Sequence, residues 1–402
     1  MNITQRTFAI AGRWCIHAYY TLCPYAPDGS GRLLVAGADL AAQTGHVYIL
    51  SGDGRVLDCF GAGPLESNFF HTGYWQTWSP GCRYVYYQSG VWSSPAITRR
   101  ELETGRELTL PGDMEGAPPD GEPLVSGLMG MLYAAGYGEG KYQPQRAPVP
   151  FAERERHGLF EYTFDPPASH LRLSVGDVLE RHPQRDMLLA ADRQAREQLG
   201  PGEGLTLMTY CVRWNPAGDR FLFFFGNHNV VRERGEPRLA YVFTSNRNFT
   251  DIHLAVDISL GRRGVHWSWH PDGEHLVGYG PDPDNEGHMC LAQVRYDGSD
   301  YRRISRHDSG GHPSISPADH SLAVTDTGGQ PGQVVLIDLR QDRIVETVRL
   351  PRVYGEREPS GRNPLRVCHH PVFSRDGQTI LVNSLPDRRA QLVQLGLREA
   401  EA

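Results

Sequence analysis

Four histidines stand at a repeated place in the sequence, shortly before a turn-forming segment. His71, His266, His312 and His370 each precede such a segment by about four to nine residues. Imidazole binds metal ions and transfers protons near neutral pH, so histidines that converge could form a metal site or an acid–base site. A single histidine of this kind is more often a structural residue than a ligand, whereas four in one register favour a functional cluster. The choice depends on whether the fold brings them together.

The turn-forming segments repeat along the chain. Most of them start with Ser, His or Asn followed by Pro, continue with Gly or Asp, and lead into an apolar strand. They cover residues 26–29, 79–81, 215–219, 270–273, 316–319 and 374–377. Pro presets φ, Asp bonds to its own backbone and Gly accepts a positive φ, so these segments favour tight turns between strands.

The spacing of the turns predicts the fold class. Successive turns lie roughly 45 to 60 residues apart except across one wider gap, in which residues 123–134 supply a further unit. Seven units with four short strands each are typical of a propeller. We therefore predict one all-β domain over residues 1–402, a seven-bladed β-propeller. The strand near residues 7–10 should complete the blade that ends at residues 392–395, because ring closure removes exposed sheet edges.

The innermost strand of each blade lines the channel of a propeller, so the four histidines should converge on its axis. The alternative fold is a pair of β-sandwiches in which the turns recur by coincidence.

The repeat is interrupted over residues 136–204, which we interpret as an insertion between blades. Within it, residues 187–199 have a helical composition and are stopped by Gly200, Pro201 and Gly202. The insertion could act as a lid over one end of the channel, or it could be a spacer without a chemical role.

Composition narrows the function classes. The 402 residues carry a formal net charge of −7, which excludes the usual electrostatic footprint of a nucleic-acid-binding protein. The seven cysteines are odd in number and widely spaced, which argues against a disulfide framework and favours a reducing compartment. Neither a signal segment nor a run of membrane-spanning length is visible. We therefore expect a cytoplasmic protein that binds neither nucleic acid nor membrane.

Several segments resemble the oligogalacturonate lyases. In that family a His precedes a Trp-x-Pro-Asp-Gly turn, and His266 stands at the same spacing before residues 269–273. His312 matches a second family His that opens the next blade, and Arg238 matches an Arg at the head of an outer strand. Residues 365–371 resemble, in part, a Gln-x-x-His-Pro-His-Pro run. The resemblance implies a cytoplasmic seven-bladed propeller that cleaves short pectic oligosaccharides by β-elimination.

This last run differs from the family at two ligand positions. Leu365 replaces the family Gln and Cys368 replaces the first His, while the final His is kept as His370. The resemblance implies a divalent metal ion, manganese or zinc, held by His312, His370 and Cys368, with His369 as a possible substitute ligand. A thiolate favours zinc over manganese. Alternatively, the two departures mean that the metal site has been lost.

A uronic-acid lyase removes the proton at C5 and expels the oxygen at C4. A metal ion or Arg on the carboxylate stabilises the developing charge, and a neutral base takes the proton. Either His266 or Arg238 would be the base and the other would neutralise charge. Chemistry favours His266 because the pKa of an Arg is so high, whereas the resemblance leaves Arg238 open. Four residues are further candidates for substrate contacts: His71, Trp75, His228 and Arg366. The blander alternatives are packing between blades for Trp75 and a solvated surface position for His228 and Arg366.

The expected partner is an acidic oligosaccharide. Two rival functions remain open at this point: a non-catalytic propeller that serves as a binding platform with a degenerate site, and a propeller enzyme for another uronide, such as ulvan or a rhamnose–glucuronate glycan.

Overall fold

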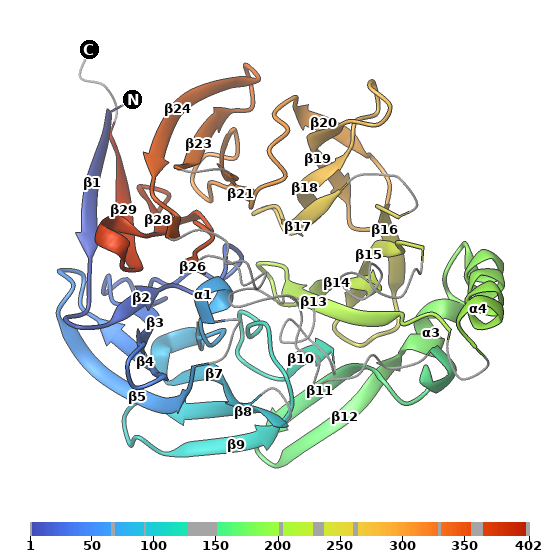
Figure 1. The fold of residues 1–402 in the computed structure, drawn as a ribbon, viewed down its shortest axis with the longest axis horizontal. Coiled ribbons are helices and arrows are strands. Elements are labelled where there is room, and N and C mark those ends of the chain that lie inside the picture. Colours follow the sequence, from blue (N-terminus) through green and yellow to red (C-terminus); the bar gives the residue numbers. More distant parts are fainter. Residues whose placement is uncertain are drawn as a thin grey trace.

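Seven antiparallel β-sheets surround a central axis (Figure 1). The structure is a computed structural model that describes residues 2–65, 69–91, 94–127, 151–200, 204–227, 237–259, 264–328, 331–354 and 365–398. Within these residues six sheets have four strands and the third has three. The predicted seven-bladed β-propeller is confirmed.

The strands follow one another outward in each of the first six blades. Blade one has β2 (Trp14–Ile16), β3 (Leu33–Asp39), β4 (Thr44–Leu50) and β5 (Val56–Pro64); blade two has β6 (Thr77–Trp78), β7 (Tyr84–Val91), β8 (Ser94–Glu101) and β9 (Glu107–Pro111). Blade three has β10 (Leu124–Gly127), β11 (Gly158–Phe164) and β12 (Pro167–Ser174); blade four has β13 (Met208–Trp214), β14 (Arg220–Gly226), β15 (Ala240–Asn246) and β16 (Ile252–Asp257). Blade five has β17 (Val265–Trp269), β18 (His275–Pro281), β19 (Met289–Arg295) and β20 (Arg302–Ser305); blade six has β21 (Ser314–Ile315), β22 (Leu322–Thr327), β23 (Gly332–Asp338) and β24 (Arg343–Leu350). A two-stranded ribbon, β25 (Val353–Tyr354) and β26 (Leu365–Arg366), precedes the last blade.

The seventh blade closes the ring with both ends of the chain. Its inner strands are β27 (Val372–Phe373), β28 (Thr379–Ser384) and β29 (Gln391–Arg398), and its outermost strand is β1 (Asn2–Phe8). Thr7 pairs with Val393 and Phe8 with Leu392, so the two termini lie side by side (Figure 1). The predicted closure is confirmed: β1 covers the edge of β29 and becomes the outermost strand of this blade.

All six predicted turns connect the innermost strand of a blade to its second strand. The turn after β17 shows how the sequence makes it. Asp272 Oδ1 accepts the backbone N–H groups of Glu274 at 2.9 Å and His275 at 3.0 Å, and Gly273 adopts a φ of 76°, where a side chain would be strained. The turn therefore sets the point at which each inner strand ends, and with it the register of the residues upstream.

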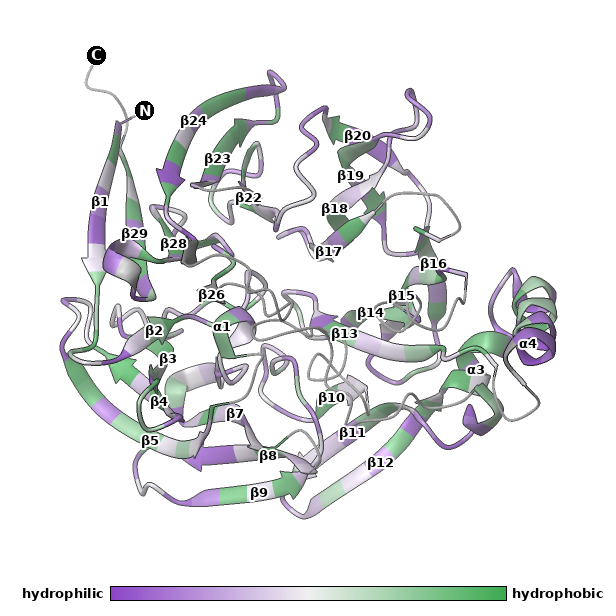
Figure 2. Cartoon of the chain, in the orientation of Figure 1, coloured by the Kyte–Doolittle hydropathy of each residue, from purple (hydrophilic) through white to green (hydrophobic). Residues whose placement is uncertain are grey.

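The segment 136–204 is only partly an insertion. Its residues 158–174 form β11 and β12, which belong to the third blade. The helices α3 (Val175–Glu180) and α4 (Arg185–Leu199) follow, and α4 confirms the helix predicted over 187–199. Figure 2 shows hydrophobic and hydrophilic residues on different sides of α4, and Leu188 is fully buried in a core cluster shared with blade four. The strands were missed because the third blade lacks the turn motif that marks the other six.

The core lies between neighbouring blades, as where phenylalanines of β14 in blade four share one buried cluster with Val125 and Leu159 of blade three. Phe221, Phe223 and Phe225 of β14 are fully buried, and Phe223 stacks on Phe243 of β15 with ring centroids 5.7 Å apart. Short helical segments complete the description: α1 (Phe69–Thr72) and the 3-10 turns Pro80–Cys82, Phe151–Glu153 and Pro386–Arg388. Within the described residues, no helix has both the length and the apolar character needed to span a membrane.

Candidate active site and metal centre

One position in the inner strands recurs around the axis. Four residues before the start of their turns stand Trp75, Cys211, His266, His312 and His370. The backbone is left-handed at four of them, with φ of 54° at Trp75, 56° at Cys211, 59° at His266 and 46° at His370. The strand pairing skips at Cys211 and at His266. Such irregularities redirect a side chain and gather at functional sites, and the common register explains why residues from different blades meet.

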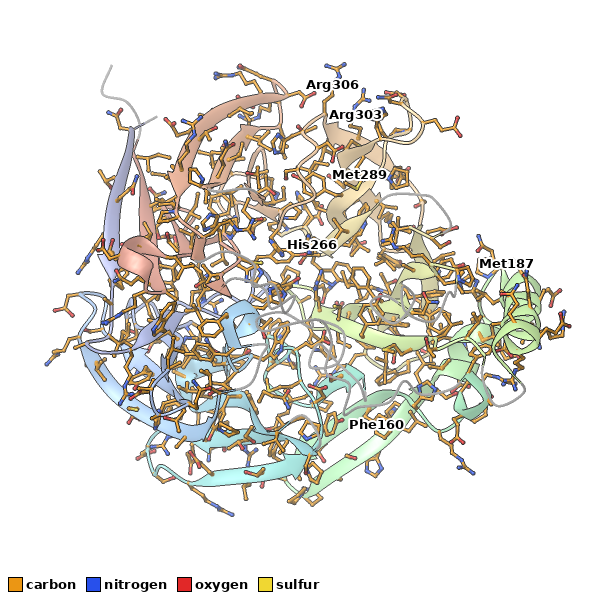
Figure 3. The ribbon with its side chains drawn as sticks, viewed as in Figure 1. Phe160, Met187, His266, Met289, Arg303 and Arg306 are labelled. Atoms are coloured by element: carbon orange, nitrogen blue, oxygen red, sulfur yellow. The ribbon has the colours of Figure 1, made fainter. Side chains whose placement is uncertain are left out.

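The imidazoles from blades five, six and seven meet in one cluster. The ring centroids of His266 and His312 are 4.0 Å apart, and those of His312 and His370 are 4.3 Å apart. His71, on α1, joins the cluster at 4.7 Å from His370. Figure 3 shows His266 near the centre of the ring, whereas Arg306 lies at the outer edge of its blade. The structure thus brings together all four histidines that the turn spacing singles out.

Burial keeps the imidazoles of His266 and His370 neutral. It lowers the pKa of His370 well below its usual value, and the neighbouring His312 adds to the effect. Burial also lowers the pKa of His266 well below its usual value, again reinforced by His312 and then by Arg213. A fifth ring, His17 after β2, has its pKa lowered by burial to about 4. Neutral imidazoles carry lone pairs, so the cluster is suited to binding a cation or accepting a proton.

A smaller group within the cluster has metal-ligand spacing. His71, Cys368 and His370 are buried, and their potential ligand atoms all lie within 4.8 Å of one another. Cys368 and His370 belong to the predicted ligands. His71, which the sequence placed among the substrate contacts, takes the place beside them, and His312 lies outside this group although its ring is next to that of His370.

The donors of this group fit a soft divalent cation. Two imidazoles and one sulfur are the ligand types that zinc prefers. Both ring nitrogens of His370 are buried without a hydrogen-bond partner among the described residues. Such burial lowers the stability of the folded protein unless a ligand binds to these nitrogens. Arg352 Nη2 lies 3.8 Å from Cys368 Sγ, and a nearby guanidinium favours the thiolate form of a cysteine.

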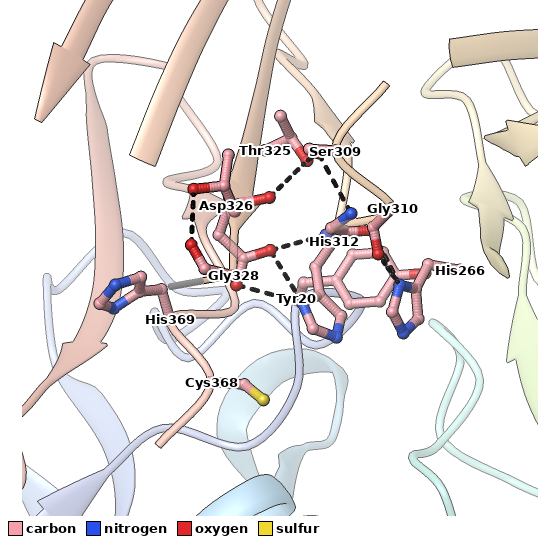
Figure 4. A network of polar contacts seen from close by, with 12 residues as sticks. Tyr20, His266, Ser309, Gly310, His312, Thr325, Asp326, Gly328, Cys368 and His369 are labelled. Atoms are coloured by element: carbon pink, nitrogen blue, oxygen red, sulfur yellow. Dashed lines mark hydrogen bonds and ion pairs between the residues drawn. The ribbon is translucent and has the colours of Figure 1, made fainter. Parts of the chain in front are cut away.

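His369, the expected substitute ligand, points elsewhere. Its Nδ1 lies 2.6 Å from the carbonyl oxygen of Asn383, and its Nε2 faces Gly332 of β23, where an added Cβ would come within 2.5 Å. Figure 4 shows its ring on the far side of Gly328, away from Cys368 and His312. The interpretation of His369 as a substitute ligand therefore has no support in this arrangement.

The two candidate bases lie near each other. His266 is oriented through Nδ1, which lies 2.8 Å from the carbonyl oxygen of Gly311 and 3.1 Å from that of Gly310. Arg238, just before β15, is exposed, and its Nη2 donates to the carbonyl oxygen of Gly264 at 3.3 Å. Because Gly264 immediately precedes the strand that carries His266, Arg238 lies at the rim of the cluster.

The other predicted substrate contacts are less favoured. Trp75 is 1% exposed and packs against Tyr19 with ring centroids 5.3 Å apart, so it has a packing role and offers no free face to a sugar. The backbone of Arg366 lies in β26, while its side chain and the whole of His228 lie outside the described residues.

Three residues of the cluster were not identified from the sequence. Tyr20 lies with its ring centroid 5.2 Å from that of His312. The buried Arg213 of β13 donates to Tyr20 Oη at 2.9 Å and to the carbonyl oxygen of Trp267, and its guanidinium lies 5.3 Å from the ring centroid of Tyr19. A charged residue inside an otherwise buried strand was the available signal for Arg213; the tyrosines carry no such signal.

A separate cavity of about 390 Å³ opens where the turns converge, at the other end of the inner strands. Trp78, Trp214 and Trp269 line it together with Glu115 and the turns of several blades. None of the four clustered histidines contributes to its walls. The histidine cluster is therefore a distinct site.

Solved structures share this fold. An oligogalacturonate lyase from Vibrio parahaemolyticus superposes with a TM-score of 0.63 at 14% identity, covering 99% of this chain and 98% of that one. An oligogalacturonate lyase in complex with manganese gives 0.63 at 16% identity over 99% and 97%. The Swd1 β-propeller domain of Myceliophteria thermophila gives 0.57 at 12% identity over 99% of both chains. Identities this low show a common fold alone. No family model matches the chain, and no curated protein matches it in sequence.

Proposed function

We propose that this chain is a lyase that cleaves uronic-acid-containing oligosaccharides by β-elimination across C4 and C5. The observation that carries the proposal is the group of closely packed imidazoles beside a thiol at the axis of the propeller. The shared fold with two oligogalacturonate lyases, one of them in complex with manganese, supports it.

His266 is the proposed base. A backbone carbonyl only accepts hydrogen bonds, so the contacts of His266 Nδ1 with Gly310 and Gly311 place the ring proton on Nδ1. Nε2 then carries the lone pair that can accept the C5 proton. Because burial lowers the pKa of His266, the ring stays neutral and ready to act as a base at neutral pH.

The uronate carboxylate needs a positive partner while the C5 proton leaves. Arg238 at the rim is placed to pair with a carboxylate that enters the cluster. His71, Cys368 and His370 would hold a divalent cation, with the thiolate favouring zinc over manganese. When bound, such an ion supplies Lewis-acid stabilisation of the charge that develops on the carboxylate.

The test combines a metal analysis of the purified protein with a screen of acidic oligosaccharides for ultraviolet-absorbing, unsaturated products. The panel should contain oligogalacturonates, ulvan fragments and rhamnose–glucuronate fragments. His266→Gln should lower kcat by about 10²- to 10⁴-fold, the range of general base catalysis. His288→Gln is the matched control, because His288 is exposed on the β18–β19 connection.

Two outcomes separate the proposal from its rivals. Unsaturated products from a fragment other than oligogalacturonate would keep the reaction and change the substrate. A protein that binds no divalent metal and releases no unsaturated product from any member of the panel would contradict the lyase and favour a binding platform.

A further inference from the structure

We propose that Asp326, acting with Gly310 and Gly311, is a positioning residue that fixes the tautomers of two imidazoles, so that Nε2 of both His266 and His312 faces the axis as a lone-pair donor. The placement of the protons is a property of the metal-free protein. Its consequence for metal binding and catalysis rests on the proposed function.

The contact of Asp326 with His312 is bidentate and buried. Asp326, in β22, accepts the backbone N–H of His312 at 2.7 Å and lies 2.9 Å and 3.1 Å from His312 Nδ1 through its two carboxylate oxygens (Figure 4). Both residues are almost fully buried: His312 is 5% exposed and Asp326 is 3% exposed. An ionised carboxylate accepts hydrogen bonds only, so Nδ1 of His312 must carry the proton.

The same short segment orients the second ring. The carbonyl oxygens of Gly311 and Gly310 accept from His266 Nδ1 at 2.8 Å and 3.1 Å. The two rings lie 4.0 Å apart and are tilted by 34°. Residues 310–312 therefore hold one imidazole through their carbonyl groups and present the other to Asp326.

Glycine at position 311 makes this possible. A Cβ there would lie 1.7 Å from the backbone oxygen of Asp326 and 2.7 Å from its Oδ1, so only Gly allows the segment to approach β22 this closely. Both Nδ1 atoms are thus occupied by fixed acceptors. Nε2 of His312 is buried without a partner among the described residues, beside the ring of His370.

The geometry predicts a specific failure in Asp326→Asn. Oδ1 is the oxygen nearest to both the backbone N–H and Nδ1 of His312, and Oδ2 lies 3.1 Å from Nδ1. With the amide oxygen at the Oδ1 position, the NH₂ group replaces Oδ2, so a donor faces the Nδ1–H bond. This repulsion, together with the loss of the negative charge, shifts the ring proton towards Nε2. The lone pair is removed from the axis with little change in shape, and the second tautomer, that of His266, should stay as it is because its acceptors are backbone carbonyls.

The first measurement is long-range ¹H–¹⁵N NMR on metal-free protein labelled with ¹⁵N-histidine, with signals assigned through His312→Gln and His266→Gln. We expect both rings as Nδ1–H tautomers in the wild type and His312 alone as Nε2–H in Asp326→Asn. Thr325→Val is the control: Thr325 is the buried neighbour of Asp326 and binds Tyr279 Oη at 3.2 Å, so its loss perturbs the strand and leaves both tautomers unchanged.

The second measurement is zinc affinity by competition with a chromophoric chelator. His312 lies outside the group of His71, Cys368 and His370, but its ring is next to that of His370, so its Nε2 would complete the coordination of an ion held by that group. Asp326→Asn should therefore weaken zinc affinity about 10- to 100-fold, the usual cost of losing a partner that orients a ligand, whereas Asp326→Glu should restore part of the loss. The inference is overturned if the wild-type His312 is an Nε2–H tautomer, or if Asp326→Asn leaves its tautomer unchanged. Because the NMR measurement needs neither metal nor substrate, an absence of lyase activity would contradict the proposed function and leave this result standing.

Discussion

The buried carboxyl of Glu115 gives the stability of this protein a pH dependence that can be worked out from its surroundings. Glu115 is 4% exposed and accepts the backbone N–H of Cys211 at 2.9 Å. Burial raises its pKa from 4.5 to about 8, the nearby Asp113 adds to this, and Arg213 opposes it. The folded protein therefore holds a proton on Glu115 at pH values where the unfolded chain has released it.

The direction and the size of the pH dependence of stability follow from the difference between the folded and the unfolded pKa of Glu115. A carboxyl with a higher pKa in the folded protein than in the unfolded chain stabilises the folded protein in its protonated form. This stabilisation is complete at pH values below the unfolded pKa and is lost as the pH rises through the folded pKa. Between 4.5 and about 8, at about 1.36 kcal/mol per pH unit, the free energy of unfolding should fall by up to about 5 kcal/mol through this group alone. Glu115→Gln keeps the acceptor for Cys211 and cannot ionise.

The assay is urea unfolding, followed by tryptophan fluorescence, for the wild type and Glu115→Gln at several values between about pH 5 and pH 8. The free energy of unfolding of the variant, relative to the wild type, should rise steadily with pH across this window. Subtracting the two proteins removes the contribution of every other titrating group. Glu274→Gln, at a side chain 60% exposed, should give a difference that is constant with pH. A constant difference for Glu115→Gln as well would refute the reasoning, because it would mean that Glu115 is ionised in the folded protein.

Three further changes test the fold and the metal centre. Cys368→His should lower the preference for Zn²⁺ over Mn²⁺ in competitive loading, because an imidazole replaces the soft sulfur ligand; an unchanged preference would mean that sulfur does not bind the ion. Phe223→Ala removes a fully buried ring that stacks on Phe243 and should lower the free energy of unfolding by about 3–5 kcal/mol in urea unfolding. A loss below about 1 kcal/mol would show that the side chains around Phe223 repack freely into the space it leaves. Deleting residues 2–8 removes β1 and exposes the edge of β29, so the melting temperature should fall and association should increase in light scattering. A deletion that changes neither the light scattering nor the melting temperature would show that closure by β1 is dispensable.

The repeated turns carry most of what could be predicted of the fold. Each turn marks the end of an inner strand, so counting turns gives the blades and fixes the register of His266, His312 and His370. The third blade follows this logic only in part. Residues 123–134 predict a unit there and contain β10, but β10 and β11 are not joined by such a turn, so β11 and β12 fell within the predicted insertion. The site was harder to predict, because part of it lies outside the repeated inner strands. His71 sits on the short helix α1 and not on an inner strand, so register could not show that it meets Cys368.

Contacts between side chains of different blades could not be predicted from the sequence. Asp326 lies near the end of a regular strand, in the sequence Thr-Asp-Thr, with no motif around it. Its role becomes visible only in the structure, where residues 310–312 approach it. Arg213 is visible as a charge in an apolar strand, yet its contact with Tyr20 joins blade four to the segment after β2. Such pairs depend on how blades stack, which local pattern does not encode.

The equal register of the inner strands also explains why the site is one-sided. The position four residues before the turn is His in blades five, six and seven, but Trp75 in blade two and Cys211 in blade four. Trp75 packs on Tyr19, and the backbone of Cys211 binds Glu115, so in these blades the position is used for packing and backbone hydrogen bonding. Different residues at this one shared position thus contribute to an asymmetric centre. Substitutions at Trp75 should therefore act on stability, whereas substitutions at His266 should act on the chemistry with the fold intact.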